Sequence, residues 1–211
     1  STGAPKTSVG SVGDYAVNTT HASNKIYFKN DGNSWVQLGS NAWSISHPTI
    51  IGTKSTGAVT SGHSIVINGT TVTTNSTTFA NVAERINAAS ITGVTAAVDA
   101  NTGFIEIYSN GTSKSDGSTL DGKITLANGS GSILTDTGLT AGTYAAPQFY
   151  QAGHTLRPEW KSADTTPRPN GSVWFKTTTP NNGTSIVAKL YSSATSLFST
   201  VSSPLYSTHH N

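Results

Sequence analysis

Histidines and carboxylates are the side chains of this chain that could hold a metal ion or transfer a proton. The six histidines are His21, His47, His63, His154, His209 and His210, and cysteine is absent. A structural zinc site needs closely spaced Cys or His ligands, whereas these histidines lie in separate parts of the chain. The terminal pair could instead be the start of a purification tag. The sequence therefore predicts no metal site and no cofactor.

Paired carboxylates would indicate glycoside hydrolysis, which needs two acidic groups roughly 5–10 Å apart in a cleft. Glu84 lies beside Arg85 on an amphipathic stretch and is expected to face solvent. The remaining acidic residues considered are scattered, mostly in turns: Asp14, Asp99, Glu106, Asp116, Asp121, Asp136, Glu159 and Asp164. Distant strands can still build a site together, but no pattern identifies one. The sequence predicts a protein that is not an enzyme and has no catalytic residues.

Asp116 and Asp121 are candidates for contact with a ligand or partner. They lie in TSKSDGSTLDGK, residues 112–123, which lacks the alternating ligands and closing Glu of an EF-hand calcium loop. We expect this stretch to be a flexible hairpin tip, and binding residues often lie on such tips.

Aromatic residues supply the other contact candidates. Trp35 and Trp174 occupy strand positions that favour core packing. Trp43, Trp160 and Tyr150 lie in linking segments, and aromatic residues are enriched at protein interfaces. The candidate contact residues are therefore Trp43, Trp160, Tyr150, Asp116 and Asp121.

Composition favours a β-rich protein with a weakly charged surface. Only 34% of the 211 residues are hydrophobic and 10% are charged, against roughly 25% charged in an average globular domain. Val, Ile, Thr and aromatic residues recur at strand-like spacings, which favours sheet over disorder. The net charge of +2 is spread thinly, without a basic cluster for nucleic acid, and no apolar run could span a membrane. The opening STGAPKTSVG, without Met, suggests an excised piece of a longer polypeptide.

The first block, residues 1–48, reads as a small β unit. Period-two patterns predict strands at Tyr15 to Val17 and at Ile26 to Phe28. A tight turn at Asp31-Gly32 leads into a third strand from Trp35 to Leu38.

The middle block, residues 49–145, reads as an α+β module. A hairpin turns at Asn68-Gly69, and a helix is predicted over residues 77–89 with Ser76 or Thr77 as its cap. A second hairpin turns at residues 101–103, and KITLAN supplies one more strand. The apolar helix face is expected to cover one side of one small sheet.

The last block, residues 165–211, repeats the plan of the first, and residues 146–164 form a connector between the module and this block. NGSVWFKTTTP corresponds to GSVGDYAVNTT, and TSIVAKLYSSATSLF to NKIYFKNDGNSW. We interpret the two blocks as a divergent repeat that packs together, with the module as an insertion. The predicted fold class is mainly β, with small antiparallel units flanking a β-hairpin/helix/β-hairpin sandwich.

Residues 62–144 resemble the flagellin "IN" motif found in flagellins, filament-cap proteins and hook-associated proteins. The matching features are the Ile67-Asn68-Gly69 turn, the helix end Arg85-Ile86-Asn87-Ala88, the stretch Gly93-Val94-Thr95-Ala96 and the Gly103 turn into Ile105. The later ITLANGSGSILTDTGLTAGTY resembles the stretch that commonly comes after the motif in those proteins. The flanking GSVGDYAVNTT and PRPNGSVWFKTTTPNNG look instead like β units of tailed-bacteriophage tail-fibre and other virion proteins. These resemblances imply an assembly or adhesion module with no catalytic residues to carry over.

The sequence thus predicts a non-enzymatic structural component of an extracellular assembly, in first place a bacteriophage virion protein of the tail, a fibre or the head decoration. Its partners would be other copies of itself and other virion proteins, with no nucleic acid and no membrane. One alternative is a bacterial-surface, flagellar filament-cap or hook-associated module, although the long terminal helices of flagellins are not evident. The other is an adhesin domain that binds a host-surface glycan or receptor.

Overall fold

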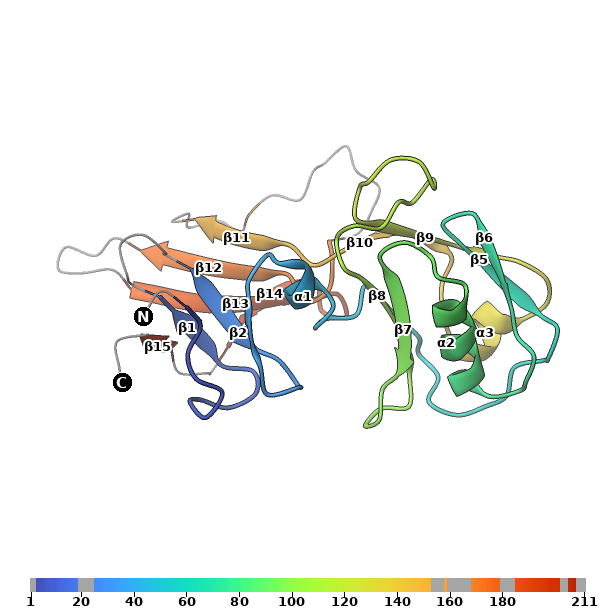
Figure 1. Ribbon diagram of the computed structural model, residues 1–211, viewed down its shortest axis with the longest axis horizontal. Helices are drawn as coiled ribbons and strands as arrows, with labels where there is room; N and C mark the ends of the chain where they lie inside the picture. Colours follow the sequence, from blue (N-terminus) through green and yellow to red (C-terminus); the bar gives the residue numbers. More distant parts are fainter. Residues whose placement is uncertain are drawn as a thin grey trace. The chain divides into compact units, whose positions relative to one another are not determined.

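The computed structural model describes residues 3–18, 25–152, 158, 168–178, 185–201 and 205–207 (Figure 1). Within these ranges the fold is mainly β with several small sheets and few helices, which confirms the predicted fold class. The chain forms two compact units. Unit 1 comprises Ser1–Ser46, Pro147–Lys161 and Asn170–Asn211, and unit 2 comprises His47–Ala146 and Ser162–Pro169. The first and last sequence blocks therefore belong to one unit.

Unit 1 contains two four-stranded sheets, which we call sheet 1 and sheet 2. Sheet 1 has the strand order β15-β1-β2-β3, with β15 Leu205–Ser207, β1 Tyr15–Val17, β2 Ile26–Lys29 and β3 Trp35–Gln37. Sheet 2 has the order β11-β12-β13-β14, with β11 Phe149–Ala152, β12 Val173–Thr178, β13 Ser185–Ser192 and β14 Leu197–Thr200. β15 is parallel to β1 and β11 is parallel to β12, whereas the other pairs are antiparallel.

The two sheets share one hydrophobic core. Alternate residues of β1 and β2 join those of β12 and β13 in a cluster of buried side chains: Tyr15, Ile26, Phe28, Leu38, Trp43, Val173, Phe175 and Ala188. The rings of Tyr15 and Phe175 meet edge to face at 5.5 Å between centroids. The first and last blocks thus bury their apolar faces against each other, because each block alone has only one small sheet and no cover for it.

The turn between β2 and β3 differs from the predicted two-residue turn at Asp31-Gly32. The N–H of Asn30 donates to the carbonyl of Ser34 at 2.9 Å. The left-handed residue is Asn33, with φ of 56°. A longer loop that ends in a left-handed Asn is the alternative geometry for joining antiparallel strands.

Segment 3–10 covers the face of sheet 1 opposite the shared core. Lys29 is only 1% exposed, and its ammonium group donates to the carbonyls of Thr7, Val9 and Gly10 at 2.6, 2.7 and 2.8 Å. The indole N–H of Trp35 donates to the carbonyl of Lys6 at 3.2 Å. Each of the three ammonium N–H groups therefore has its own carbonyl acceptor, which makes burial of this lysine tolerable.

Unit 2 contains two sheets, which corrects the expectation of a single one. One sheet has the order β10-β9-β5-β6, with β10 Gly142–Ala145, β9 Lys123–Asn128, β5 Ser64–Ile67 and β6 Thr70–Thr73. The other has the order β4-β8-β7, with β4 Ile50–Ile51, β8 Ile105–Ser109 and β7 Val94–Val98. Each predicted hairpin pairs with a different distant strand, a choice that local patterns do not encode.

Both predicted hairpins of unit 2 are confirmed. β5 and β6 pair up to Ile67 opposite Thr70, and Asn68 and Gly69 have φ of 48° and 78°. Two consecutive positive φ values are those of a type I′ turn. β7 and β8 pair with Val98 opposite Ile105.

The helix α2, Phe79–Ala88, lies where the apolar periodicity predicts it, but its cap is Thr78 instead of Ser76 or Thr77. The Thr78 hydroxyl accepts from the N–H of Asn81 at 3.2 Å. The Asn81 side-chain oxygen in turn accepts from the N–H groups of Asn75 and Ser76, both at 3.1 Å, and holds them outside the helix. Two short helices, α1 Asn41–Ser44 and α3 Ile133–Thr137, were not predicted.

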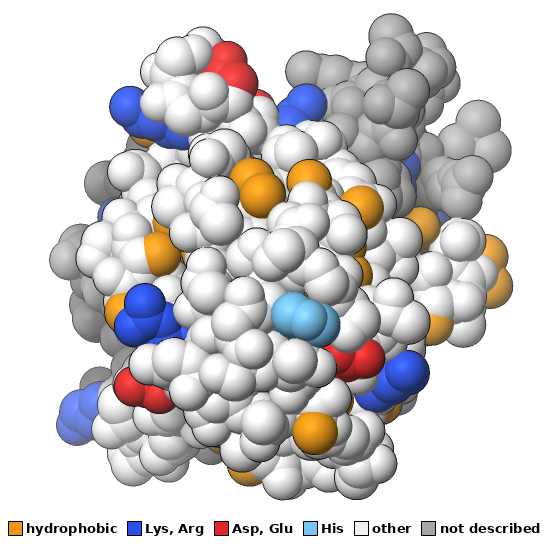
Figure 2. Space-filling model, turned by 90° about the vertical axis from the view of Figure 1, so that its right-hand side faces the viewer, with side chains coloured by type: hydrophobic (Ala, Val, Ile, Leu, Met, Phe, Trp, Pro, Cys, Tyr) orange, Lys and Arg blue, Asp and Glu red, His pale blue; other side chains and the backbone are white. Residues whose placement is uncertain are grey.

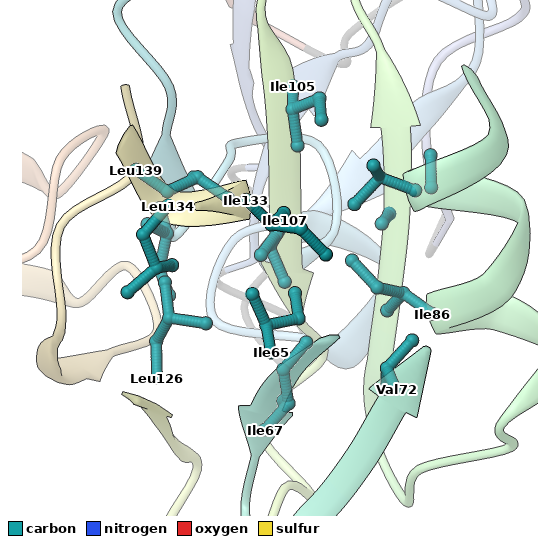
Figure 3. Close-up of a cluster of buried hydrophobic side chains, with 14 of the residues drawn as sticks. Ile65, Ile67, Val72, Ile86, Ile105, Ile107, Leu126, Ile133, Leu134 and Leu139 are labelled. Carbon is teal, nitrogen blue, oxygen red and sulfur yellow. The ribbon is translucent and has the colours of Figure 1, made fainter. Parts of the chain in front are cut away.

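Helix α2 connects the two sheets of unit 2. Phe79, Val82 and Ile86 point into a core that takes residues from both sheets (Figure 3). At the outer edge of β7, the Asn87 side chain donates to the carbonyl of Ala96 and accepts from its N–H, both at 2.8 Å. This two-way bond occupies the edge of the sheet in place of another strand. No described helix is long and apolar enough to cross a membrane.

Candidate functional site

The loop of residues 110–122, between β8 and β9, carries both Asp116 and Asp121 in unit 2 (Figure 1). It has no helix or strand of its own. Loops of about 12 or more residues without secondary structure are uncommon in compact domains, and they are usually either functional or linker and disordered segments. We name this segment the 110–122 loop and treat it as the candidate functional site.

Two buried serines close the neck of the 110–122 loop. The Ser109 hydroxyl donates to the carbonyl of Gly122 at 2.9 Å and lies 2.7 Å from the Ser113 hydroxyl. The Ser113 carbonyl accepts from the N–H groups of Asp121 and Gly122 at 3.2 and 3.0 Å. The two ends of the loop are thus held together by buried hydrogen bonds, which are stronger than exposed ones.

Gly93, which precedes β7, allows the neck to pack this closely. Its φ is 70°, and a Cβ added there would lie 2.5 Å from the backbone nitrogen of Ser113. Its carbonyl accepts from the N–H of Asn110 at 3.0 Å. A side chain at this position would push the neck away, because both the left-handed backbone and the space require glycine.

The two aspartates fold the tip of the loop. Asp121 accepts from the N–H and hydroxyl of Ser115 and from the N–H of Lys123. Burial raises the pKa of Asp121, but these bonds from Ser115 and Lys123 outweigh it and leave the pKa below its ordinary value. Asp116 accepts from the N–H groups of Ser118 and Thr119, both at 2.8 Å. The tip is therefore preorganised by its own side chains.

We expect acid to release the Asp116 turn. Hydrogen bonds from the N–H groups of Thr119 and Ser118 lower the pKa of Asp116 from 3.8 to about 2. Because the pKa is lower in the folded loop, its stabilisation is complete above pH 3.8 and is lost as the pH falls through about 2. An NMR titration should show the Asp116 carboxyl and both amides moving with one midpoint near pH 2. In Asp116→Asn the amide titration should vanish, and a wild-type midpoint near 3.8 would contradict the prediction.

The tip presents small polar groups around one apolar side chain. Residues 116–121 are all exposed, and Leu120 is 61% exposed. A rigid tip with hydroxyls, a carboxylate and one exposed leucine can contact a partner without an ordering cost on binding. The loop offers contact chemistry and no evident reaction chemistry.

Of the aromatic candidates, Trp43 and Tyr150 belong to unit 1, whereas the 110–122 loop belongs to unit 2. Trp43 is not in a linker: it lies in α1, is 1% exposed and packs into the core of unit 1, so its ring has no surface to offer a partner. Tyr150 lies in β11 opposite Trp174 and is half-buried. Trp160 lies outside the described residues. Trp35 and Trp174 are buried, as their strand positions predict.

Four other described carboxylates accept local hydrogen bonds, as Asp116 does. Asp14 accepts from the N–H of Ser11 at 2.7 Å, Asp99 accepts from Asn101 and Thr102 in its hairpin turn, and Asp136 accepts from the Ser132 hydroxyl. On β8, Tyr108 donates to Glu106. In the part of the chain that the structure describes, no three His, Asp or Glu side chains cluster as metal ligands would. His21, His154, His209 and His210 lie outside that part.

On the face shown in Figure 2, most of the surface is uncharged polar side chains and backbone, with Lys, Arg, Asp, Glu and some hydrophobic side chains between them. Comparison of the chain with protein-family models, with curated proteins and with solved structures finds no match.

Proposed function

We propose that this chain is a non-enzymatic structural component of an extracellular assembly, a bacteriophage virion, and that it works by packing against other copies of itself and other virion proteins. The observation that carries the proposal is the architecture of unit 1. Sheet 1, built from strands near the start of the chain, is completed by β15 from the far end of the chain, which lies beside β1. Such strand sharing is a common way to join protein units.

The side-chain chemistry supports the same proposal. The carboxylates of the described turns and helix ends accept hydrogen bonds that hold local structure. A glycoside hydrolase would instead need two carboxylates together in a cleft. Charge is sparse, at 12 basic and 10 acidic residues in 211. A surface with few charges lets identical copies approach without strong mutual repulsion.

An adhesin domain that binds a host-surface glycan or receptor is the second candidate. The preorganised 110–122 loop, with Leu120 and hydroxyls at an exposed tip, favours it. A glycan array with the wild-type chain and with a loop variant, Asp116→Ala, addresses this candidate. Binding that the variant loses would favour adhesion over assembly.

The assembly proposal predicts self-association. Native mass spectrometry over a concentration series should show discrete oligomers of the 21.8 kDa chain. Immunogold electron microscopy of phage particles from the source culture should place the chain at regular intervals on a tail, fibre or head. A chain that stays monomeric throughout and labels no particle would overturn the proposal.

A further inference from the structure

Unit 1 contains the same four-stranded pattern twice. In each sheet, three consecutive strands form an antiparallel meander, and a fourth strand lies parallel to the first strand of that meander. The meanders are β1-β2-β3 and β12-β13-β14, and the fourth strands are β15 and β11. The similarity of the first and last sequence blocks therefore has a counterpart in strand pairing.

The two meanders share one hydrogen-bond register. The N–H of Gly13 donates to the carbonyl of Lys29 at 2.8 Å, and the N–H of Gly171 donates to that of Tyr191 at 3.0 Å. At the other end of the second strand, Leu38 donates to Ile26 at 2.9 Å, and Val201 donates to Ala188 at 3.0 Å. These bonds make Val173 the structural equivalent of Tyr15. The comparison of the two sequence blocks instead places the equivalent of Tyr15 two residues further along the chain.

The final turns of the two meanders also match. The left-handed residue before β3 is Asn33 and the one before β14 is Ser196, both with φ of 56°. A non-glycine residue in this conformation is uncommon. Its recurrence at the same place, two residues before the paired positions Trp35 and Phe198, supports a true structural repeat.

The two fourth strands differ in where they lie along the sequence. β11 directly precedes β12 in strand order and pairs with it, with Phe149 opposite Val173. β15 follows β14, yet it pairs with β1 at the other end of the chain, with Leu205 opposite Tyr15. Because Tyr15 and Val173 are equivalent, the two fourth strands pair in equivalent register, and β15 is the one that crosses to the other meander.

The edge of β1 that faces away from β2 presents backbone N–H and C=O groups that can pair with a further strand. Asp14 and Asn18 bond toward β2, since Lys29 donates to the Asp14 carbonyl at 2.9 Å and Asn18 donates to the Lys25 carbonyl at 2.8 Å. Backbone groups alternate in direction along a strand. Those of Tyr15 and Val17 therefore face the opposite side, where β15 lies. On β12 the equivalent N–H, that of Val173, donates to the carbonyl of Gln148 at 2.9 Å.

We propose that β15 is an exchangeable strand, and that in the assembled state the β15 of one copy pairs with β1 of a second copy in the register seen here within one chain. This proposal rests on the proposed assembly function and names the contact that would link copies. A strand exchanged between copies makes the same hydrogen bonds as one within the chain. Whether β15 pairs within its own chain or with a second copy then depends on two concentrations: the effective concentration of the chain's own strand and the concentration of other copies.

Cysteine cross-linking between two full-length variants tests the exchange. Val17 lies opposite Ser207 in the β1–β15 pair, and the chain has no native cysteine to interfere. Val17→Cys and Ser207→Cys are mixed at rising concentration and oxidised. Neighbouring strands hold Cα atoms within disulfide range, roughly 4.4–6.8 Å. The control is Val17→Cys mixed with Leu197→Cys, because Leu197 is 60% exposed on β14 and outside this pair.

The expected product is a mixed disulfide dimer of twice the 21.8 kDa chain mass. Its yield should exceed that of the control by about tenfold or more, because strand pairing holds the thiols at an effective concentration near mM. An excess of a peptide of residues 202–211 should reduce this yield. Equal yields in the two mixtures would overturn the exchange. If native mass spectrometry still showed oligomers in that case, the assembly proposal would stand and another surface would join the copies.

Discussion

Replacing Lys29 by Met is expected to lower the free energy of unfolding of unit 1 by about 3 kcal/mol. Each hydrogen bond from a charged donor contributes roughly 1.5–3 kcal/mol. Removal of the buried charge offsets part of that loss. The variant removes the donors to the carbonyls of Thr7, Val9 and Gly10. Met keeps an aliphatic stem of similar length but also removes the ammonium group 5.6 Å from the centroid of the Trp35 ring, so the change reports on all contacts of the charge. Denaturant unfolding followed by tryptophan fluorescence measures the effect.

Lys189→Met is the matched control for this variant. Lys189 lies on β13 and donates at 3.3 Å to the exposed Thr200 hydroxyl, so its loss should change stability by less than about 0.5 kcal/mol. Limited proteolysis adds a local readout, because segment 3–10 should become cleavable in Lys29→Met and stay protected in the control. Equal stability of the two variants would show that Lys29 does not hold this segment.

Replacing Ile86 by Ala is expected to destabilise unit 2 by about 2–5 kcal/mol, the usual cost of truncating a fully buried isoleucine. Ile86 is 0% exposed and lies on α2 among residues of both sheets of the unit (Figure 3). The cavity would open where helix and sheets meet, so little relaxation can fill it. Calorimetry should show one unfolding transition moving down in temperature.

Glu84→Ala on the same helix is the control for this second variant. Glu84 is exposed, and its contact with the Asn81 amide is 3.3 Å long, so a change below about 0.5 kcal/mol is expected. The shared core of Tyr15 and Phe175 has no member in α2, so the transition of unit 1 should not move. A fall of both transitions together would mean that the units unfold as one.

Local patterns were sufficient for the elements whose geometry depends on near neighbours. The Asn68-Gly69 turn follows from the left-handed conformation that these two residues tolerate. Helix α2 follows from the spacing of Phe79, Val82 and Ile86. The three strands of the first block lie where period-two residue patterns predict them, although all four residues of β2 are buried.

The candidate site was only partly predictable. Asp116 and Asp121 lie in an exposed loop, as the Gly-, Ser- and Asp-rich stretch around them predicts. The expected hairpin tip is wrong, because β8 and β9 belong to different sheets and the loop joins those sheets. The sequence did not identify the serines of the neck, Ser109 and Ser113. A serine buried at a loop closure looks in the sequence like any serine near the end of a strand. Trp43 was misplaced for a related reason: a four-residue helix is too short to produce a periodic pattern.

By itself, the sequence determined the mainly β class, the hairpins, the main helix and the likeness of the first and last blocks, because these depend on residue type over short separations. Only the tertiary structure decided which strands pair. It made β11 a strand within the expected connector, divided unit 2 into two sheets, and placed β15 beside β1 and not beside β14. Any exposed strand edge carries the same N–H and C=O groups, so the choice of partner depends on how whole faces bury one another in three dimensions.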